Sequence, residues 1–255
     1  MTGRWSDVAP SRRTVGIAVA LLLAVGVLVA AGVGVYFAIG SGPDEAALAE
    51  VEADPDVSVE RLDGTTAVRS GPVTAETTGL VYYPGARVNP ESYVPSAAET
   101  VAGRDLVVVI VDTPLNLAVL GQSRADGARE PFPAIDSWAV GGHSLGGAMA
   151  CRYAAANTAD LDALVLHAAY CDRDISDTDL RALSVLDDSD GVIDTERERE
   201  SRVNLPPETR IVGLSGVNHA GFGAYGTQRG DESVETDPRE MRAAVGNVTG
   251  PWLVE

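Results

Sequence analysis

The sequence of 255 residues contains no lysine, and it is poor in histidine, cysteine and aromatic residues. All 19 basic residues are arginine, and 37 acidic residues oppose them, which gives a formal net charge of -18. A chain this acidic repels phosphate, so we exclude a sequence-nonspecific nucleic-acid binder. The three histidines and two cysteines form no Cys-x-x-Cys pair and no His-rich cluster, so we expect neither a metal nor another cofactor.

The two cysteines, Cys151 and Cys171, fall on a predicted helix and near the end of a predicted strand. Their spacing alone does not bring the two sulfur atoms together. We therefore expect free, buried thiols rather than a disulfide, although an extracellular location would allow the pair to form.

Charge is also missing from one long run near the N-terminus, residues 14–39, which holds 26 uncharged and mostly apolar residues. A helix of that length exceeds the roughly 30 Å of a bilayer core. Tyr36 and Phe37 lie near its far end, where aromatic rings favour the membrane interface. The run predicts a transmembrane anchor over residues 14–39, preceded by a short tail, residues 1–13.

The charges on either side of this run predict its orientation. Arg4, Arg12 and Arg13 precede it, whereas the charged residues between it and Arg61 are all acidic. The positive-inside rule places the tail in the cytoplasm and the remainder outside a single-pass cell-membrane anchor. The alternative is a secreted protein with a cleaved signal peptide, whose apolar core is normally about 7–15 residues long and which ends at an A-x-A site that is not evident here.

The apolar run also explains why so acidic a chain has a slightly positive mean hydropathy of +0.05. The 213 residues from Pro43 onward hold 36 acidic and 16 basic residues, a net charge of -20. Such lysine-free, acidic surfaces resemble those of proteins that work in molar salt, so we expect a halophilic domain, with a coding bias toward arginine as the alternative.

Residues 40–56 are rich in Gly, Pro, Ala and acid and are predicted to be a linker, followed by one domain over residues 57–255. That domain begins with a predicted hairpin and then alternates strands with helices, which indicates an α/β fold with a mostly parallel sheet covered by helices on both faces. The predicted strands are 57–61, 67–70, 79–83, 106–111, 138–141, 163–167, 183–186 and 210–214. Helices are predicted after Asn89 and over about 117–128, 144–156, 194–203 and 238–247.

The run Gly142-His143-Ser144-Leu145-Gly146 matches Gly-x-Ser-x-Gly between a predicted strand and a predicted helix. This context is typical of a nucleophile elbow, a sharp turn that lifts the serine hydroxyl above the sheet. The oxyanion hole is predicted to use the backbone N–H of Leu145 and a second N–H after the strand 79–83, from Gly85 or Ala86. A plain N-cap serine is the alternative interpretation of Ser144.

A serine nucleophile needs a histidine base and an acid that orients it, each on a loop after a later strand. His219 follows the strand 210–214 and is the predicted base. Asp190 follows the strand 183–186 and is the predicted acid, with Asp187 and Asp188 as alternatives and Asp194 as a weaker one.

Four ordered motifs resemble the α/β-hydrolase fold-5 family, relatives of the dienelactone hydrolases. They are Y-Y-P-G-A-R-V-N-P-E-S-Y, P-L-N-L-A-V, G-G-H-S-L-G-G-A-M-A and N-H-A-G-F-G-A-Y-G, within roughly residues 57–250. The resemblance implies an α/β-hydrolase fold without a large lid and a triad of Ser144, Asp190 and His219. Further residues of the shared motifs would line the pocket or brace its loops, namely Arg87, Asn116 and Tyr225.

These observations predict a membrane-anchored serine hydrolase that cleaves carboxylic ester-type bonds in a small or lipid-like molecule through an acyl-enzyme. The alternative is a catalytically silent surface protein with the same fold, acting as a binding module. The sequence identifies neither the substrate nor the oligomeric state.

Overall fold

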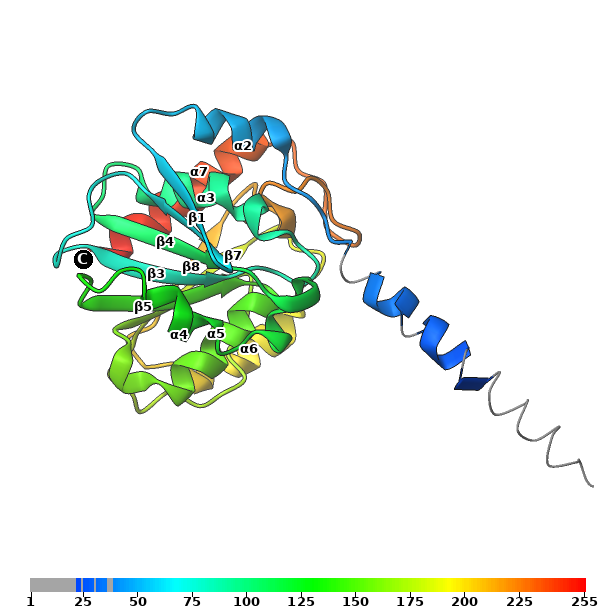
Figure 1. Ribbon diagram of the computed structural model, residues 1–255. Helices are drawn as coiled ribbons and strands as arrows, with labels where there is room; N and C mark the ends of the chain where they lie inside the picture. Colours follow the sequence, from blue (N-terminus) through cyan, green and yellow to red (C-terminus); the bar gives the residue numbers. More distant parts are fainter. Residues whose placement is uncertain (1–21, 24, 30, 36–38) are drawn as a thin grey trace, which may run out of the picture.

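The computed structural model describes residues 22–23, 25–29, 31–35 and 39–255 (Figure 1). The predicted cytoplasmic tail and the first part of the predicted membrane anchor lie outside these residues, as do positions 24, 30 and 36–38. The described residues between 22 and 35 are helical, and their apolar side chains are largely exposed. Within the described part of the chain, no helix combines the length and the apolar character that crossing a membrane requires.

Eight strands form one mixed sheet in the order β1-β2-β4-β3-β5-β6-β7-β8. The pairs β1–β2 and β2–β4 are antiparallel, and all other neighbours are parallel. The fold is therefore α/β with a mostly parallel sheet, as the alternation of patterns predicted. The strands are β1 (Ser58–Leu62), β2 (Thr65–Arg69), β3 (Thr78–Tyr83), β4 (Leu106–Val111), β5 (Ser137–His143), β6 (Ala163–His167), β7 (Arg181–Asp187) and β8 (Arg210–Leu214).

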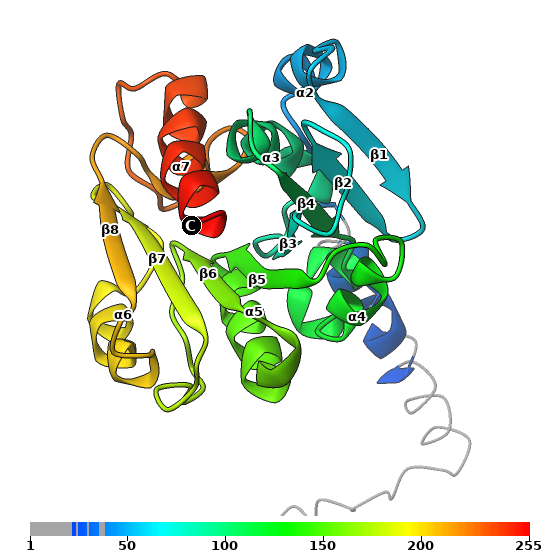
Figure 2. The same ribbon diagram turned by 90° about the vertical axis from the view of Figure 1, so that its left-hand side faces the viewer.

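Helices cover both faces of this sheet, as Figure 2 shows in an end-on view. One hydrophobic core joins the sheet to α2 (Glu45–Glu52), α3 (Val94–Val101) and α7 (Pro238–Leu253). The other core joins it to α4 (Arg124–Arg129) and α5 (Leu145–Ala156). The interior strand β4 is apolar at every position and buried along its whole length because its side chains enter both cores.

The remaining helical segments are short. They are α6 (Thr195–Ser201) and the 3-10 turns η1 (Pro90–Tyr93), η2 (Pro114–Asn116), η3 (Ala118–Leu120), η4 (Thr158–Asp160), η5 (Arg202–Asn204) and η6 (His219–Phe222). The helix predicted over about 117–128 is wrong in its extent, because the chain there forms η3 and then α4. Leu115 and Asn116 have φ values of 56° and 54°, so the backbone turns sharply before this segment.

The segment predicted as a linker, residues 40–56, forms ordered structure against the domain. Asp44 caps α2 by accepting hydrogen bonds from the N–H groups of Ala46 and Ala47. Leu48 of α2 is buried in the core beneath it. Ion pairs also join Glu52 to Arg61 and Glu50 to Arg239. Composition predicted an open tether, whereas one buried leucine and a capped helix make the segment part of the fold.

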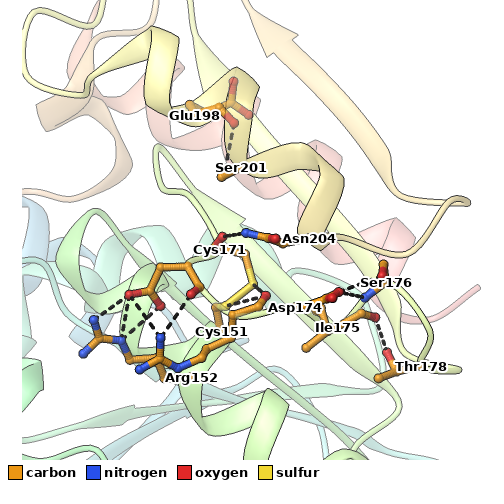
Figure 3. Close-up of a disulfide and its surroundings, with 12 residues drawn as sticks. Cys151, Arg152, Cys171, Asp174, Ile175, Ser176, Thr178, Glu198, Ser201 and Asn204 are labelled. Carbon is orange, nitrogen blue, oxygen red and sulfur yellow. Dashed lines mark hydrogen bonds and ion pairs between the residues drawn. A yellow bond between two sulfur atoms is a disulfide. The ribbon is translucent and has the colours of Figure 1, made fainter.

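Cys151 and Cys171 form a disulfide, which corrects the prediction of two free thiols (Figure 3). Their Cα atoms are 5.3 Å apart, one on α5 and the other four residues after β6. The pairing arises because Ala168, at a φ of 42°, turns the chain back over α5, where Ala169 lies against Gly147. The bond ties α5, the helix that follows Ser144, to the loop that follows β6.

Candidate active site

Ser144 occupies the turn between β5 and α5 in a strained backbone conformation, with φ 54° and ψ -123°. Non-glycine residues rarely adopt this region, and such strain is typical of functional turns. The side chain of Ser144 makes no capping hydrogen bond to α5, although the residue occupies the N-cap position. An N-cap serine would use its hydroxyl in that way. The geometry therefore favours an elbow over the plain capping role.

The glycines on either side of Ser144 are required by close backbone packing. A Cβ atom at Gly142 would lie 2.6 Å from the backbone of Gly146, and one at Gly146 would lie 2.1 Å from the carbonyl oxygen of Tyr83. No side chain fits at such distances. The Gly-x-Ser-x-Gly pattern thus follows from the need to pass α5 directly over the ends of β3 and β5.

His219 and Asp190 meet at the carboxyl edge of the sheet. His219 begins η6 after β8, and its Nδ1 lies 2.8 Å from Oδ2 of Asp190. Both side chains are almost completely buried. Because a carboxylate only accepts, Nδ1 of His219 is the donor in this hydrogen bond. Nε2 is buried and has no hydrogen-bond partner among the described residues.

The surroundings of Asp190 hold it in the charged form. Burial on its own would raise the pKa of Asp190, but the hydrogen bond and charge of His219 bring that pKa below its usual value. The backbone N–H groups of Val192 and Ile193 add to this effect by donating to Oδ1 at 2.7 and 2.8 Å. Asp190 is thus arranged to orient His219 and to balance a positive charge on its ring.

The other three candidate acids lie elsewhere or behave differently. Asp188 accepts a hydrogen bond from the N–H of Gly216, and Asp194 caps α6. Asp187, the last residue of β7, is partly buried beside Asp190, and burial together with the Asp190 charge raises the pKa of Asp187 to about 8. Its two carboxyl oxygens have no hydrogen-bond partner among the described residues. Of the candidates that the sequence left open, Asp190 is the one hydrogen-bonded to His219.

Asp187, Asp190 and His219 are also the group whose atoms are close enough to hold a metal ion, within 4.8 Å of one another in the described part of the chain. A metal at Nδ1 of His219 would replace the hydrogen bond to Asp190. Because His219 and Asp190 are already hydrogen-bonded to each other, we interpret the cluster as a His–Asp pair rather than as a metal site.

Asp231, which no sequence pattern predicted as a site residue, holds the loop that carries His219. Its carboxylate accepts hydrogen bonds from the N–H groups of His219 and Ala220 at 3.1 and 2.8 Å. These N–H groups begin a 3-10 turn, where an acidic side chain is favourable. Asp231 lies on a later irregular loop, so neither periodicity nor a motif marked it.

The two predicted second donors of the oxyanion hole differ in their partners. The N–H of Gly85 donates to the hydroxyl of Tyr93 at 2.9 Å, so that N–H is occupied. The N–H groups of Ala86 and Leu145 have no hydrogen-bond acceptor among the described residues. The N–H groups of Leu145 and Ala86 are therefore the pair available to donate to an oxyanion.

Tyr93 links this loop to the elbow. Burial raises the pKa of Tyr93, so its hydroxyl keeps its proton, and it is hydrogen-bonded to Nδ1 of His143, 2.9 Å away. The ring of His143 lies 4.4 Å from that of His219 and stacks on Phe222. Burial, and then the nearby rings of His219 and His167, lower the pKa of His143 well below its usual value. A neutral His143 therefore packs beneath His219 without adding a competing charge.

The three residues expected to line the pocket or brace its loops have bracing contacts. The N–H of Arg87 donates to the carbonyl of Asn116 at 2.7 Å, which joins the loop after β3 to η2. Tyr225 is buried, packs 6.3 Å from the ring of Tyr93 and donates its hydroxyl to Gln228.

An eight-stranded, mostly parallel sheet with a Gly-x-Ser-x-Gly turn at the carboxyl end of β5 defines an α/β protein of the hydrolase type. A model of the alpha/beta hydrolase family matches residues 79–242, and the chain belongs to that family. The matched range includes the elbow, the loop of Asp190 and the turn of His219. No curated protein sequence matches the chain significantly.

Proposed function

We propose that the protein is a serine hydrolase that cleaves carboxylic esters with a triad of Ser144, His219 and Asp190. The observation that carries the proposal is the Asp190–His219 hydrogen bond at 2.8 Å, made by the loops after β7 and β8 at the same sheet edge as the strained Ser144. Parallel strands bring their carboxyl ends together, so three loops far apart in sequence converge there.

In this mechanism Nε2 of His219 takes the proton of the Ser144 hydroxyl as its oxygen attacks the ester carbonyl carbon. The N–H groups of Leu145 and Ala86 hold the oxyanion that forms. The imidazolium then protonates the leaving alcohol, which leaves an acyl group on Ser144. Water, deprotonated by His219, attacks that acyl carbon, and collapse of the second tetrahedral intermediate releases the acid and restores the serine.

We further propose that residues 14–39 hold the domain at a cell membrane with the N-terminus in the cytoplasm. The apolar run, the three arginines before it and the acidic residues after it support this proposal. The secreted form after signal cleavage is the competing outcome, and the mass of the N-terminal peptide from the mature protein distinguishes the two.

The decisive experiment labels the folded protein with a fluorophosphonate and identifies the modified residue by mass spectrometry. We expect the label on Ser144 and a loss of p-nitrophenyl acetate hydrolysis of at least about 10³-fold in Ser144→Ala. Ser123→Ala is the matched control, because Ser123 also occupies an N-cap position without a capping bond and precedes a short helix outside the site. A folded protein that takes no label on Ser144 would instead be a silent binding protein of the same fold.

A further inference from the structure

Three exposed aliphatic side chains are grouped on the loop after β4. Leu115, Val119 and Leu120 are 43%, 48% and 54% exposed, and all three lie within six residues of one another. Single exposed leucines are ordinary, but a group of them indicates a contact surface. The turn η3, which carries two of them, packs against α5, the helix that begins at the nucleophile. The group therefore lies beside the helix that follows Ser144.

The backbone of this loop presents Leu115 outward at a conformational cost. Leu115 has a φ of 56°, a left-handed conformation that is uncommon for a leucine. The hydrogen bond from the N–H of Arg87 to the carbonyl of Asn116 joins this turn to the loop that carries Ala86. Strain of this kind persists only where the surrounding structure fixes it.

The apolar N-terminal run joins the domain at the same place. Ile39, its last residue, is largely exposed, and its carbonyl accepts a hydrogen bond from Arg87. The N–H of Ser41 donates to the carbonyl of Arg87 at 2.7 Å, and the carbonyl of Ser41 accepts from the N–H of Asn89.

Gly40 permits this close docking. A Cβ atom there would lie 2.3 Å from the carbonyl oxygen of Arg87 and 3.1 Å from the side chain of Asn116. The chain thus enters the domain against the loop of Ala86 and against the turn that carries Leu115. Ile39, the last residue of the apolar run, is thereby held next to the turn that carries Leu115.

We propose that Ile39, Leu115, Val119 and Leu120, here called the apolar rim, rest on the lipid bilayer that holds residues 14–39. The candidate active site then opens toward the bilayer surface, and its substrate is a membrane-resident ester with a long acyl chain. The inference about the substrate rests on the proposed function. The contact with lipid does not depend on ester hydrolysis, but it does depend on the proposed membrane anchor over residues 14–39.

The net charge of the domain determines which lipids fit this surface. A charge of -20 over the residues after 42 repels anionic headgroups, so the contact depends on apolar burial rather than on electrostatic attraction. We therefore use vesicles of zwitterionic phosphatidylcholine as the probe.

The first test measures contact with lipid in the full chain reconstituted into such vesicles. Leu120→Trp introduces a tryptophan on the rim, and lipids brominated near the headgroup quench its fluorescence if it touches the bilayer. We expect at least twofold more quenching than for Val203→Trp, which places the same probe on an exposed valine of η5. Equal quenching at the two positions overturns the docking surface, whether or not the protein hydrolyses esters.

The second test concerns the substrate. The rim variant Leu115→Ser/Val119→Ser/Leu120→Ser is compared with a control in which three other exposed aliphatic residues are replaced, Val203→Ser/Ile211→Ser/Val254→Ser. We expect the rim variant to lose at least tenfold of its rate on a long-chain ester dissolved in the vesicles and less than twofold on p-nitrophenyl acetate in water. The control should change neither rate by more than twofold.

A rim variant that keeps the wild-type rate on the vesicle-borne ester overturns the proposed substrate class. A wild-type protein that hydrolyses neither ester and takes no fluorophosphonate label overturns the proposed function instead. The two failures are therefore distinguishable in one set of preparations.

Discussion

At the scale of single residues, the site contains two neighbouring carboxyl groups whose pKa values are shifted in opposite directions. The pKa of Asp190 lies below its usual value, so Asp190 is charged, whereas the pKa of Asp187 is raised to about 8. One of two interacting buried carboxyl groups commonly keeps its proton because two adjacent negative charges repel each other. A neutral Asp187 leaves the charge on Asp190, where it faces His219.

Replacing Asp187 tests this assignment through the pH dependence of stability. A carboxyl group with a raised folded-state pKa contributes stability that is fully present below its unfolded pKa near 4 and is lost as pH rises toward 8. Asp187→Asn keeps the neutral shape and cannot ionise. We expect the urea midpoint of the wild type to fall relative to that of the variant between pH 5 and pH 9.

The control must leave the other titratable groups around Asp187 unchanged. Asp190, Asp231 and Tyr225 all interact electrostatically with Asp187, and His219 is held by Asp190; all four remain in the variant. Asp188→Asn removes an adjacent carboxylate whose pKa is lowered by its hydrogen bond to the N–H of Gly216. That variant should follow the wild-type slope over this range. Parallel curves for the wild type and Asp187→Asn would show that Asp187 is ionised at neutral pH.

At the scale of elements, local patterns and contacts between distant segments differ in how well a sequence predicts them. The apolar run of β4 and the Gly-x-Ser-x-Gly turn are local, and both have the structure that their patterns predicted. The Cys151–Cys171 bond depends on the path of the loop after β6, which is reversed by Ala168 at positive φ. Nothing in the residue type of an alanine signals that reversal.

Contacts between separate segments of the chain also account for the other differences between expectation and structure. The polar composition of residues 40–56 concealed a helix whose place is fixed by one buried leucine, Leu48, and by ion pairs to distant arginines. Asp231 and Tyr93 hold the His219 and Gly85 loops through side-chain hydrogen bonds that no motif marks. Chain order predicted which strands supply the candidate site, whereas side-chain partners between loops required the three-dimensional structure.

The disulfide gives a prediction at this scale, because it joins α5 to the loop after β6 across 20 residues of chain. Closing a loop of that length in the unfolded state is expected to stabilise the fold by about 3 kcal/mol. We expect reduction with dithiothreitol to lower the free energy of unfolding by that amount, measured by urea titration. Cys151→Ala/Cys171→Ala is the control and should not respond to the reductant. A wild type whose unfolding curve is unchanged on reduction would contradict a bond between these cysteines.

At the scale of the whole molecule, negative charge is spread over the surface and is only partly neutralised by arginine. The described residues form exposed ion pairs such as Arg61 with Glu52 and Arg239 with Glu50. Exposed pairs of this kind contribute at most about 1 kcal/mol each. The remaining acids repel one another, and this repulsion opposes the compact state at low ionic strength.

Salt should therefore stabilise the domain through screening. The Debye length falls from about 10 Å at 0.1 M salt to about 3 Å at 1 M, which removes most repulsion between exposed carboxylates. We expect the urea midpoint to rise steadily with KCl over this range. A variant in which four exposed acids become amides, Glu60→Gln/Asp177→Asn/Asp179→Asn/Glu208→Gln, should begin with a higher midpoint and show a smaller slope. If the two proteins gain stability in parallel, the effect of salt lies in general exclusion from the surface rather than in relief of charge repulsion.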